Sequence, residues 1–192
     1  MNYPIILGCD PAIKNFGWCA IRVDSENGRY KILKAGILRH TLSNVHGDLE
    51  EQVAAYSKAI NRILEKYQPT IIVCERFETR IQRRLSGSAG EAVNAMIGIL
   101  MANAVAKSIS IITVLPGAWK SKVRHRTPLP KMYNVGRARI RKLAKEKGST
   151  LKRSQDIQSR IPHATDAACL ALLRADIPIP SSLPIHVANT LF

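Results

Sequence analysis

The sequence lacks the cysteine spacing of a zinc site, and it has no apolar run long enough to cross a membrane. No CxxC or CxH pair occurs among its four cysteines, which are Cys9, Cys19, Cys74 and Cys169. This excludes the common structural zinc patterns, and we expect small buried thiols in a reducing compartment. No stretch reaches the ~20 apolar residues of a spanning helix. Because Met1-Asn2-Tyr3 lacks a basic start, we expect neither a signal peptide nor a membrane partner.

Acidic residues are scarce. The 192 residues include 14 Asp and Glu against 29 Lys and Arg, for a formal net charge of +15. Between Lys120 and Arg153 there are thirteen Lys or Arg and a single acid, Glu146, for a net charge of +12. A solvated charged face normally interleaves both signs. This stretch therefore predicts a surface that follows a phosphate backbone, which is the partner that the overall charge also favours.

The pattern of apolar residues predicts one α/β domain, for which this length is sufficient. Alternating or continuous apolar runs predict strands at 4–10, 16–23, 30–38, 70–75 and 110–115. Helical periodicity or composition predicts helices at 48–67, 91–107, 132–147 and 164–174, and residues 116–131 are predicted to be irregular. Three antiparallel strands followed by parallel crossovers predict a mixed sheet with helices on both faces. We assign residues 1–176 to this domain and 177–192 to a Pro-rich, extended C-terminal tail.

The few acids stand at informative places. Asp10 and Glu75 each end a predicted buried strand, and Asp166 opens an apolar helix pattern. Each has an ordinary structural explanation: a turn aspartate before Pro11, a strand-end partner of a nearby Arg, and a carboxylate at a helix N-terminus. Taken one at a time, these explanations are favoured over catalysis. Taken together they weaken, because one sheet and a helix packed on it can bring three carboxylates to one point.

Such a cluster repels itself and requires cations. Oxygen ligands favour Mg²⁺, with Mn²⁺ as a substitute. Two such ions ~4 Å apart would activate a water and stabilise the leaving oxygen in phosphodiester hydrolysis. His163 lies three residues before Asp166, on the same side of a helix. It is open to three interpretations, as a metal ligand, a general acid or base, or a helix N-terminal residue, and we favour a functional one.

Three motifs in this order resemble those of RuvC-like Holliday-junction resolvases. They are Ile6-Leu7-Gly8-Cys9-Asp10-Pro11 with Gly17-Trp18, then Ile72-Val73-Cys74-Glu75, then His163-Ala164-Thr165-Asp166-Ala167-Ala168. The match covers residues 4–174. The turn Ile13-Lys14-Asn15-Phe16 also resembles that of fungal mitochondrial resolvases, which belong to the same superfamily.

The resemblance implies an RNase H-like fold and a homodimer that makes paired nicks in opposed strands of a four-way DNA junction. It assigns the metal ligands and catalytic residues to Asp10, Glu75, His163 and Asp166, with two Mg²⁺ ions per site. It also implies a location in the cytoplasm of a bacterium or a phage-infected cell, or in an organellar matrix. Phe77 resembles an aromatic residue that family members insert at the crossover, and a core role for it remains open.

Candidate DNA contacts combine the resemblance with the basic segments. One of Lys120, Lys122 and Lys131 is expected to act at the scissile phosphate. The full set is Lys14, Arg76, Phe77, Arg80, Arg83, Arg84, Lys120, Lys122, Arg124, Lys131, Arg137 and Arg141. The loop after Glu75 and the segment 120–153 are more basic than in typical bacterial members, and related phage enzymes process branched DNA more broadly. The choice among branched substrates therefore stays open.

Two other functions compete with a junction-resolving endonuclease. A sugar-kinase-like or actin-like phosphotransferase would need a second domain and a second glycine-rich phosphate loop. The sequence contains neither, so we expect no nucleotide cofactor. A non-catalytic junction-binding protein of the same fold would be expected to lose one acid, whereas Asp10, Glu75 and Asp166 are all present.

Overall fold

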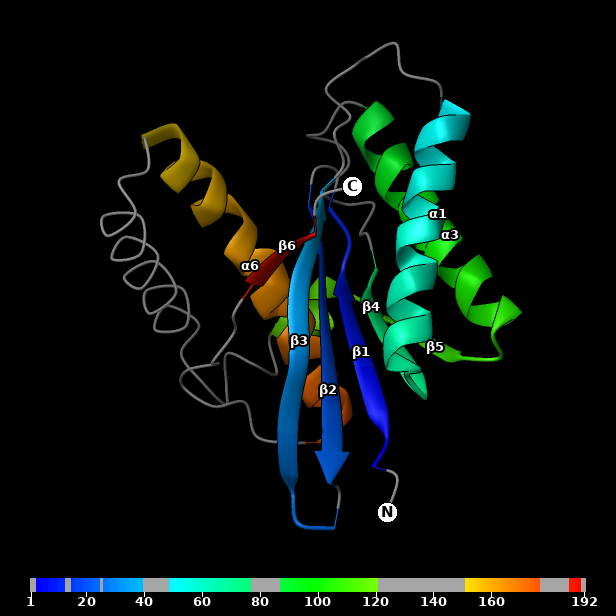
Figure 1. Cartoon of the computed structure of the whole chain (residues 1–192), viewed down its shortest axis with the longest axis vertical. Helices are drawn as coiled ribbons and strands as arrows, with labels where there is room; N and C mark the ends of the chain where they lie inside the picture. Colours follow the sequence, from blue (N-terminus) through cyan, green and yellow to red (C-terminus); the bar gives the residue numbers. More distant parts are fainter. Residues whose placement is uncertain are drawn as a thin grey trace.

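The computed structural model describes residues 3–12, 15–24, 26–39, 49–76, 87–120, 151–176 and 187–190. These form a mixed sheet with helices on both faces (Figure 1). The strands are β1 (Ile5–Asp10), β2 (Asn15–Asp24), β3 (Arg29–Arg39), β4 (Ile71–Glu75), β5 (Ser110–Val114) and β6 (Val187–Thr190). The helices are α1 (Leu49–Tyr67), α3 (Gly87–Ala106) and α6 (Leu151–Arg174). The predicted fold class is confirmed.

The sheet has the order β5-β4-β1-β2-β3-β6. Its first three strands form an antiparallel meander, and β4 and β5 then add in parallel beside β1. Asp24 closes the β2–β3 hairpin by accepting hydrogen bonds from the backbone and side-chain N–H groups of Asn27, and Gly28 adopts the left-handed φ of 60° that this turn requires. The sequence thus sets the strand register through the turn and the alternation of buried residues.

Two apolar cores lie on opposite faces of the sheet. One face packs against α1 and α3, with residues such as Phe16, Tyr56 and Leu100. The other packs against α6, whose buried residues run from Ala164 to Leu172. β1 and β2 contribute alternate residues to the two cores, as expected for a central strand covered on both sides. The order of predicted strands and helices in the sequence already indicates this arrangement, with helices on both faces of the sheet.

Two glycines let α6 lie directly on the sheet. A methyl group added at Gly8 of β1 would overlap the backbone carbonyl oxygen of Ala167. A methyl group added at Gly17 of β2 would overlap the backbone carbonyl of His163. Both strands therefore present bare backbone to the helix, and this close approach fixes where the side chains of α6 emerge.

The structure differs from the predictions at three places, the first of which is the start of α3, at Gly87 and not at Glu91. The last helix begins at Leu151, not at Ala164, and it continues through Pro162. A proline in a helix removes one backbone hydrogen bond, but this loss does not outweigh continuation of a helix whose C-terminal half packs on the sheet. Residues 116–120, predicted to be irregular, are helical. The predicted helix at 132–147 lies outside the described residues.

Part of the predicted C-terminal tail pairs with the sheet. β6 lies parallel to β3, with Val187 opposite Ala35 and Thr190 opposite Leu38. The division between residues 1–176 and 177–192 stays a prediction. None of the helices in the described ranges is both long enough and apolar enough to span a membrane.

Substituting Gly8 tests the close approach of α6. We expect Gly8→Ala to lower the free energy of unfolding by ~1–3 kcal/mol, since the new methyl group forces the backbone of α6 away from β1. Gly98→Ala is the matched control, because Gly98 is exposed on α3 with no atom within 4 Å of the added methyl. That variant should gain ~0.5–1 kcal/mol from helix propensity. Urea unfolding measures both, and equal effects of the two substitutions would contradict the packing described above.

Candidate active site

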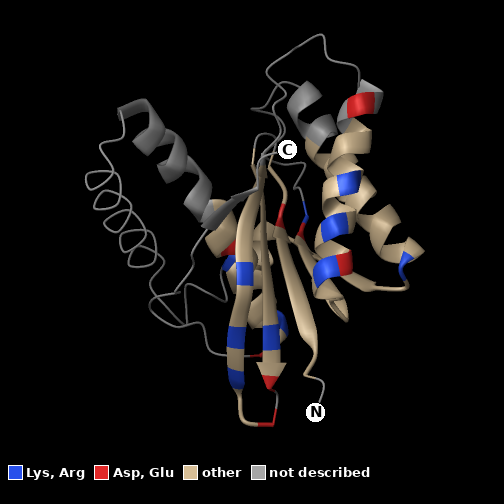
Figure 2. Ribbon diagram, viewed as in Figure 1, with Lys and Arg blue, Asp and Glu red and all other residues tan. Residues whose placement is uncertain are grey.

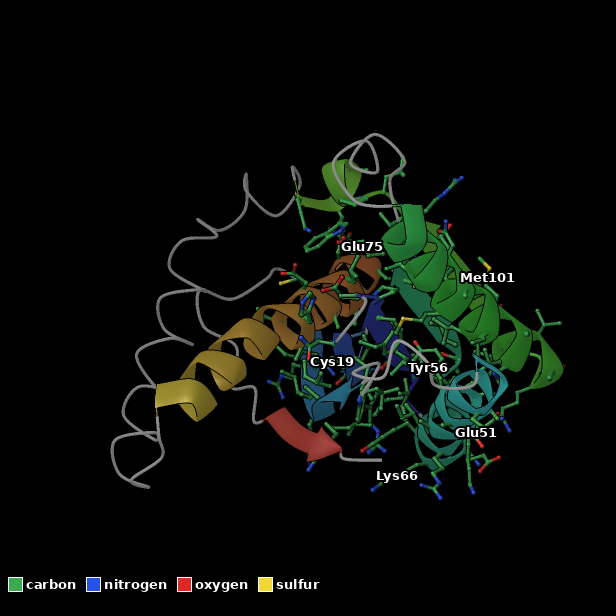
Figure 3. The ribbon with its side chains drawn as sticks, turned by 90° about the horizontal axis from the view of Figure 1, so that it is seen from above. Cys19, Glu51, Tyr56, Lys66, Glu75 and Met101 are labelled. Carbon is green, nitrogen blue, oxygen red and sulfur yellow. The ribbon has the colours of Figure 1, made fainter. Side chains whose placement is uncertain are left out.

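Two acidic side chains meet at one edge of the sheet because their strands are parallel neighbours. Asp10 ends β1 and Glu75 ends β4, and the residues just before them, Cys9 and Cys74, lie opposite each other. The side chains of both cysteines are buried in the α1-side core. Neighbouring residues in a strand face opposite ways, so the two acids turn toward the α6 side. Figure 3 shows Glu75 at this end of the sheet, beside α6.

The helix α6 adds two further side chains to this edge. His163 and Asp166 are three residues apart, so they share one face of the helix. His163 crosses to β1, where its Nδ1 lies 2.6 Å from Oδ2 of Asp10. The backbone of His163 sits directly over Gly17, the residue paired with Asp10 in the sheet. The glycine contact therefore positions this pair.

Lys120 lies between the carboxylates. It is the last residue of the helical segment 116–120, which follows β5. Its Nζ is 3.3 Å from Oε2 of Glu75 and 3.7 Å from Oδ2 of Asp166. The side chain is about one-third exposed, so it reaches both acids while keeping access to solvent. Of the three lysines predicted to act at the scissile phosphate, Lys120 is the one that the described residues place at the acids.

Trp119 forms a hydrogen bond with the carboxylate of Glu75. Its indole is fully buried in the α6-side core, and its Nε1 donates a 2.6 Å hydrogen bond to Oε2 of Glu75. The neighbouring Lys120 Nζ lies 5.0 Å from the centre of the same ring. A buried indole needs an acceptor for its single N–H, and a charged acceptor gives a strong bond. Trp119 therefore fixes one oxygen of Glu75.

The electrostatics of the site reflect burial and mutual repulsion. Burial, followed by the charge of Asp10, raises the pKa of Asp166 to about 7, although Lys120 opposes the shift. The same two causes raise the pKa of Glu75. Burial disfavours the charged form of His163, but its hydrogen bond to Asp10 and the nearby acids outweigh this and raise its pKa. The pKa of Lys120 is raised in the same way, chiefly by Glu75 against the effect of burial.

The negative charges of the three acids are balanced by neighbouring basic side chains. Asp10 pairs with His163, and Lys120 contacts both Glu75 and Asp166. Within the described ranges, no group of three or more His, Cys, Asp or Glu side chains is placed so that it could hold a metal ion. The four predicted ligands thus come together, while their role in binding metal stays a prediction.

Most of the predicted DNA contacts cannot be placed. Arg76 is exposed just after β4, and its backbone N–H donates to the carbonyl of Val114. Lys120 is in the site. The others lie outside the described residues: Lys14, Phe77, Arg80, Arg83, Arg84, Lys122, Arg124, Lys131, Arg137 and Arg141. Their roles stay predictions.

The sequence reasoning missed Trp119. The segment around it contains Pro116 and Gly117 and was interpreted as irregular, so no helical turn was expected to aim its side chain. One signal was available: a large aromatic beside Lys120, a few residues past a buried strand, seldom lies in a solvent-exposed loop. A tryptophan in such a position predicts a buried ring whose indole N–H donates a hydrogen bond to a nearby acceptor.

Known proteins resemble this chain in sequence over half of its length. The RuvC crossover junction endodeoxyribonuclease of Rickettsia africae is 27% identical over 96 residues, and that of Rickettsia typhi is 28% identical over 97. Each match covers 50% of this chain and 58% of the relative. The chain thus spans less than two-thirds of these curated relatives. No family model matches the sequence.

Solved structures resemble the chain over most of its length. RuvC of Thermus thermophilus in complex with a Holliday junction substrate aligns with a TM-score of 0.61 at 17% identity, covering 90% of this chain and 93% of that one. The yeast mitochondrial Holliday junction resolvase Ydc2 aligns with a TM-score of 0.56 at 21% identity, covering 89% and 78%. The fowlpox virus resolvase aligns with a TM-score of 0.51 at 15% identity, covering 90% and 98%. The RNase H-like fold and the resemblance to RuvC-like resolvases are confirmed.

Replacing Trp119 tests its bond to Glu75. Trp119→Phe should lower the free energy of unfolding by ~1–3 kcal/mol beyond the loss of ring volume, because it removes a hydrogen bond to a charged group. Trp18→Phe is the matched control, since among the described residues the buried Nε1 of Trp18 has no hydrogen-bond partner. Urea unfolding at pH 8 compares them. An equal or larger loss in the control would show that the bond to Glu75 contributes nothing.

The raised pKa of Asp166 predicts that the free energy of unfolding depends on pH. A carboxyl whose pKa rises from 3.8 to about 7 on folding retains its proton in the folded protein, so wild-type stability falls as pH rises from ~4 to ~7. Asp166→Asn removes this loss. In the presence of a chelator we expect the variant to exceed wild type by ~2–4 kcal/mol at pH 8 and by clearly less at pH 5. Urea unfolding at the two pH values provides the measurement, and a pH-independent difference would contradict it.

Proposed function

We propose that this protein is a metal-dependent, structure-selective endodeoxyribonuclease that resolves four-way DNA junctions by paired nicks. The observation that carries the proposal is the convergence of Asp10, Glu75, Asp166 and His163, with Lys120, at one edge of the sheet. The acids come from β1, β4 and α6, far apart in the sequence. Burial, followed by repulsion from Asp10, raises the pKa of Glu75 and of Asp166. Such perturbed groups cluster at functional sites.

The donor set suits Mg²⁺ or Mn²⁺. Three carboxylates and one imidazole offer mainly hard oxygen ligands, which these ions prefer. Asp166, with its pKa near 7, would gain from a cation that replaces the proton. In the absence of metal, the ammonium of Lys120 supplies positive charge beside Glu75 and Asp166. Because this side chain is partly exposed, it can move toward solvent when a metal ion takes its place. Asp10, Glu75, Asp166 and His163 would hold the metal, with two ions per site as the resemblance implies.

Bound metal would supply activation of the attacking water and charge for the leaving oxygen. The side chains have separate tasks beside it. The hydrogen bond from His163 orients Asp10, and Trp119 orients Glu75. Lys120, once released from the acids, can donate to a phosphate oxygen and stabilise the charge that grows there during cleavage. Water access to Asp10 and Asp166 is restricted because both side chains are buried, which strengthens their interactions.

The resemblance to junction-resolving proteins supports the choice of substrate. One of the matched structures holds a Holliday junction substrate, and two others are described as Holliday junction resolvases. A four-way junction has two-fold symmetry, so a homodimer would present two sites to opposed strands. The basic segments 76–84 and 120–153 would contact phosphates. Because phosphate contacts do not depend on sequence, these segments would also allow binding of other branched DNA. The four cysteines are free and buried, which fits a reducing compartment such as the cytoplasm or an organellar matrix.

A non-catalytic junction-binding protein is the second candidate. Lys120 occupies the space between Glu75 and Asp166, and an ammonium that stays there would take the place of metal. This observation favours the alternative. It predicts junction binding that is the same with Mg²⁺ and with chelator, and no cleavage under either condition.

Cleavage of a synthetic four-way junction separates the two candidates. With Mg²⁺, Asp10→Asn and Glu75→Gln should each lower the single-turnover rate by on the order of 10²-fold or more, because each removes charge that holds the cation. Binding of the junction should persist. Glu51→Gln, which neutralises an exposed acid on α1, is the control and should cleave like wild type.

A second readout does not depend on activity. Mg²⁺ should raise the midpoint of thermal unfolding of wild type at pH 8 and should have little effect on Asp10→Asn, because binding to the folded state stabilises it. Cleavage that survives in both acid variants would end the proposal. An equal thermal response of wild type and Asp10→Asn would show that the metal binds elsewhere.

A further inference from the structure

Three cations on β2 and β3 lie on the side of the sheet opposite α6. In β2, Arg22 follows Trp18 and Ala20 at two-residue spacing, and both of these belong to the core under α1 and α3. Lys31 is directly opposite Arg22, and Lys34 is directly opposite Ala20. Paired residues share a face, so Arg22, Lys31 and Lys34 all project on the α1 side, where each is exposed.

The helix α1 adds a stripe of three more. Lys58, Arg62 and Lys66 are exposed and recur every fourth residue, which places them in one row along the helix. The side of α1 that meets α3 is different, since Ser57 bonds to Asn103 and Glu65 pairs with Lys107. In Figure 3, Lys66 projects from α1 away from α3. Figure 2 shows basic residues along α1 and along β2 and β3.

Like-charge repulsion among these six cations lowers the stability of the folded protein. Like charges directly opposite in a sheet destabilise it, as Arg22 and Lys31 do. Like charges four residues apart destabilise a helix, as in the row of Lys58, Arg62 and Lys66. In the described part of the chain, the ion pairs made by Lys or Arg involve Lys107 and Lys120 and none of these six. The strand pair β2–β3 and the helix α1 thus each bear a like-charge repulsion that an anionic partner would relieve.

We infer that this surface, the α1 basic face (Arg22, Lys31, Lys34, Lys58, Arg62 and Lys66), binds the phosphate backbone of a duplex arm of the DNA substrate. The inference rests on the proposed function. Its chemistry is a row of cations matched to a row of phosphates, which requires no base contact and gives no sequence preference. The face lies across the sheet from His163 and Asp166. It would therefore hold an arm at a distance from the cut and set the direction in which that arm leaves the site.

The salt dependence of junction binding tests this. Each lost phosphate contact lowers the slope of log Kd against log salt concentration by about one. The double variants R22Q/K31Q and K58Q/R62Q should each lower the slope by about two, measured with a four-way junction in chelator. Their urea midpoints should equal or exceed that of wild type, because each substitution relieves repulsion. Weaker binding by a fully stable protein excludes misfolding as the cause.

The matched control is K107Q/R174Q, which also removes two positive charges but outside the α1 basic face. It should leave the slope within about half a unit of wild type. A slope in R22Q/K31Q and K58Q/R62Q that equals wild type overturns the inference, and so does an equal reduction in the control. If wild type still cleaves the junction in either case, the proposed function stands and only this inference fails. A wild type that binds no DNA overturns both.

Discussion

The candidate site depends on the direct contact between α6 and the bare backbone of β1 and β2. Gly8 lies under Ala167 and Gly17 lies under His163, with no room for a side chain at either place. This fixes the depth and rotation of the helix, and so the points at which His163 and Asp166 emerge over the end of β1. The acids of β1 and β4 are positioned by strand pairing alone. Two kinds of backbone contact, one within the sheet and one across it, therefore bring together residues that are more than 150 positions apart.

The charges at this edge of the sheet are balanced by side chains of the chain itself. Burial and repulsion raise the pKa of Asp166 and Glu75, and Lys120 and His163 oppose the cost by direct contact. The protein can therefore fold with its acids close together before any ion arrives, which a cluster of bare carboxylates would resist. Under the proposed function, Lys120 would have to leave Glu75 and Asp166 when a metal binds them, and its ammonium would then be free to contact the substrate.

Much of the fold was predictable from the sequence, because strands covered on both faces leave long apolar runs and α1 has a clear apolar stripe. The first five strands match their predicted ranges to within one residue at either end. The acids and His163 were predicted to converge because the ends of parallel strands lie together. Three features were not predictable from local sequence: the extent of α6 on the N-terminal side of Pro162, the helical turn that aims Trp119, and the contact of Lys120 with Glu75 and Asp166. Each is decided by packing between distant segments, which no local rule describes.

The pairing of β6 with β3 has a bearing on self-association. An outer strand with free N–H and C=O groups is a template for the strands of other molecules, and β3 is eleven residues long. β6 covers Ala35 to Leu38, the apolar and uncharged part of that rim. Among the described residues, no strand pairs with the outer side of the part that carries Lys31 and Lys34, whose charges would repel an approaching copy. The same two lysines would thus protect the free protein against aggregation, so that a surface suited to a polyanion would also keep unbound copies from pairing edge to edge.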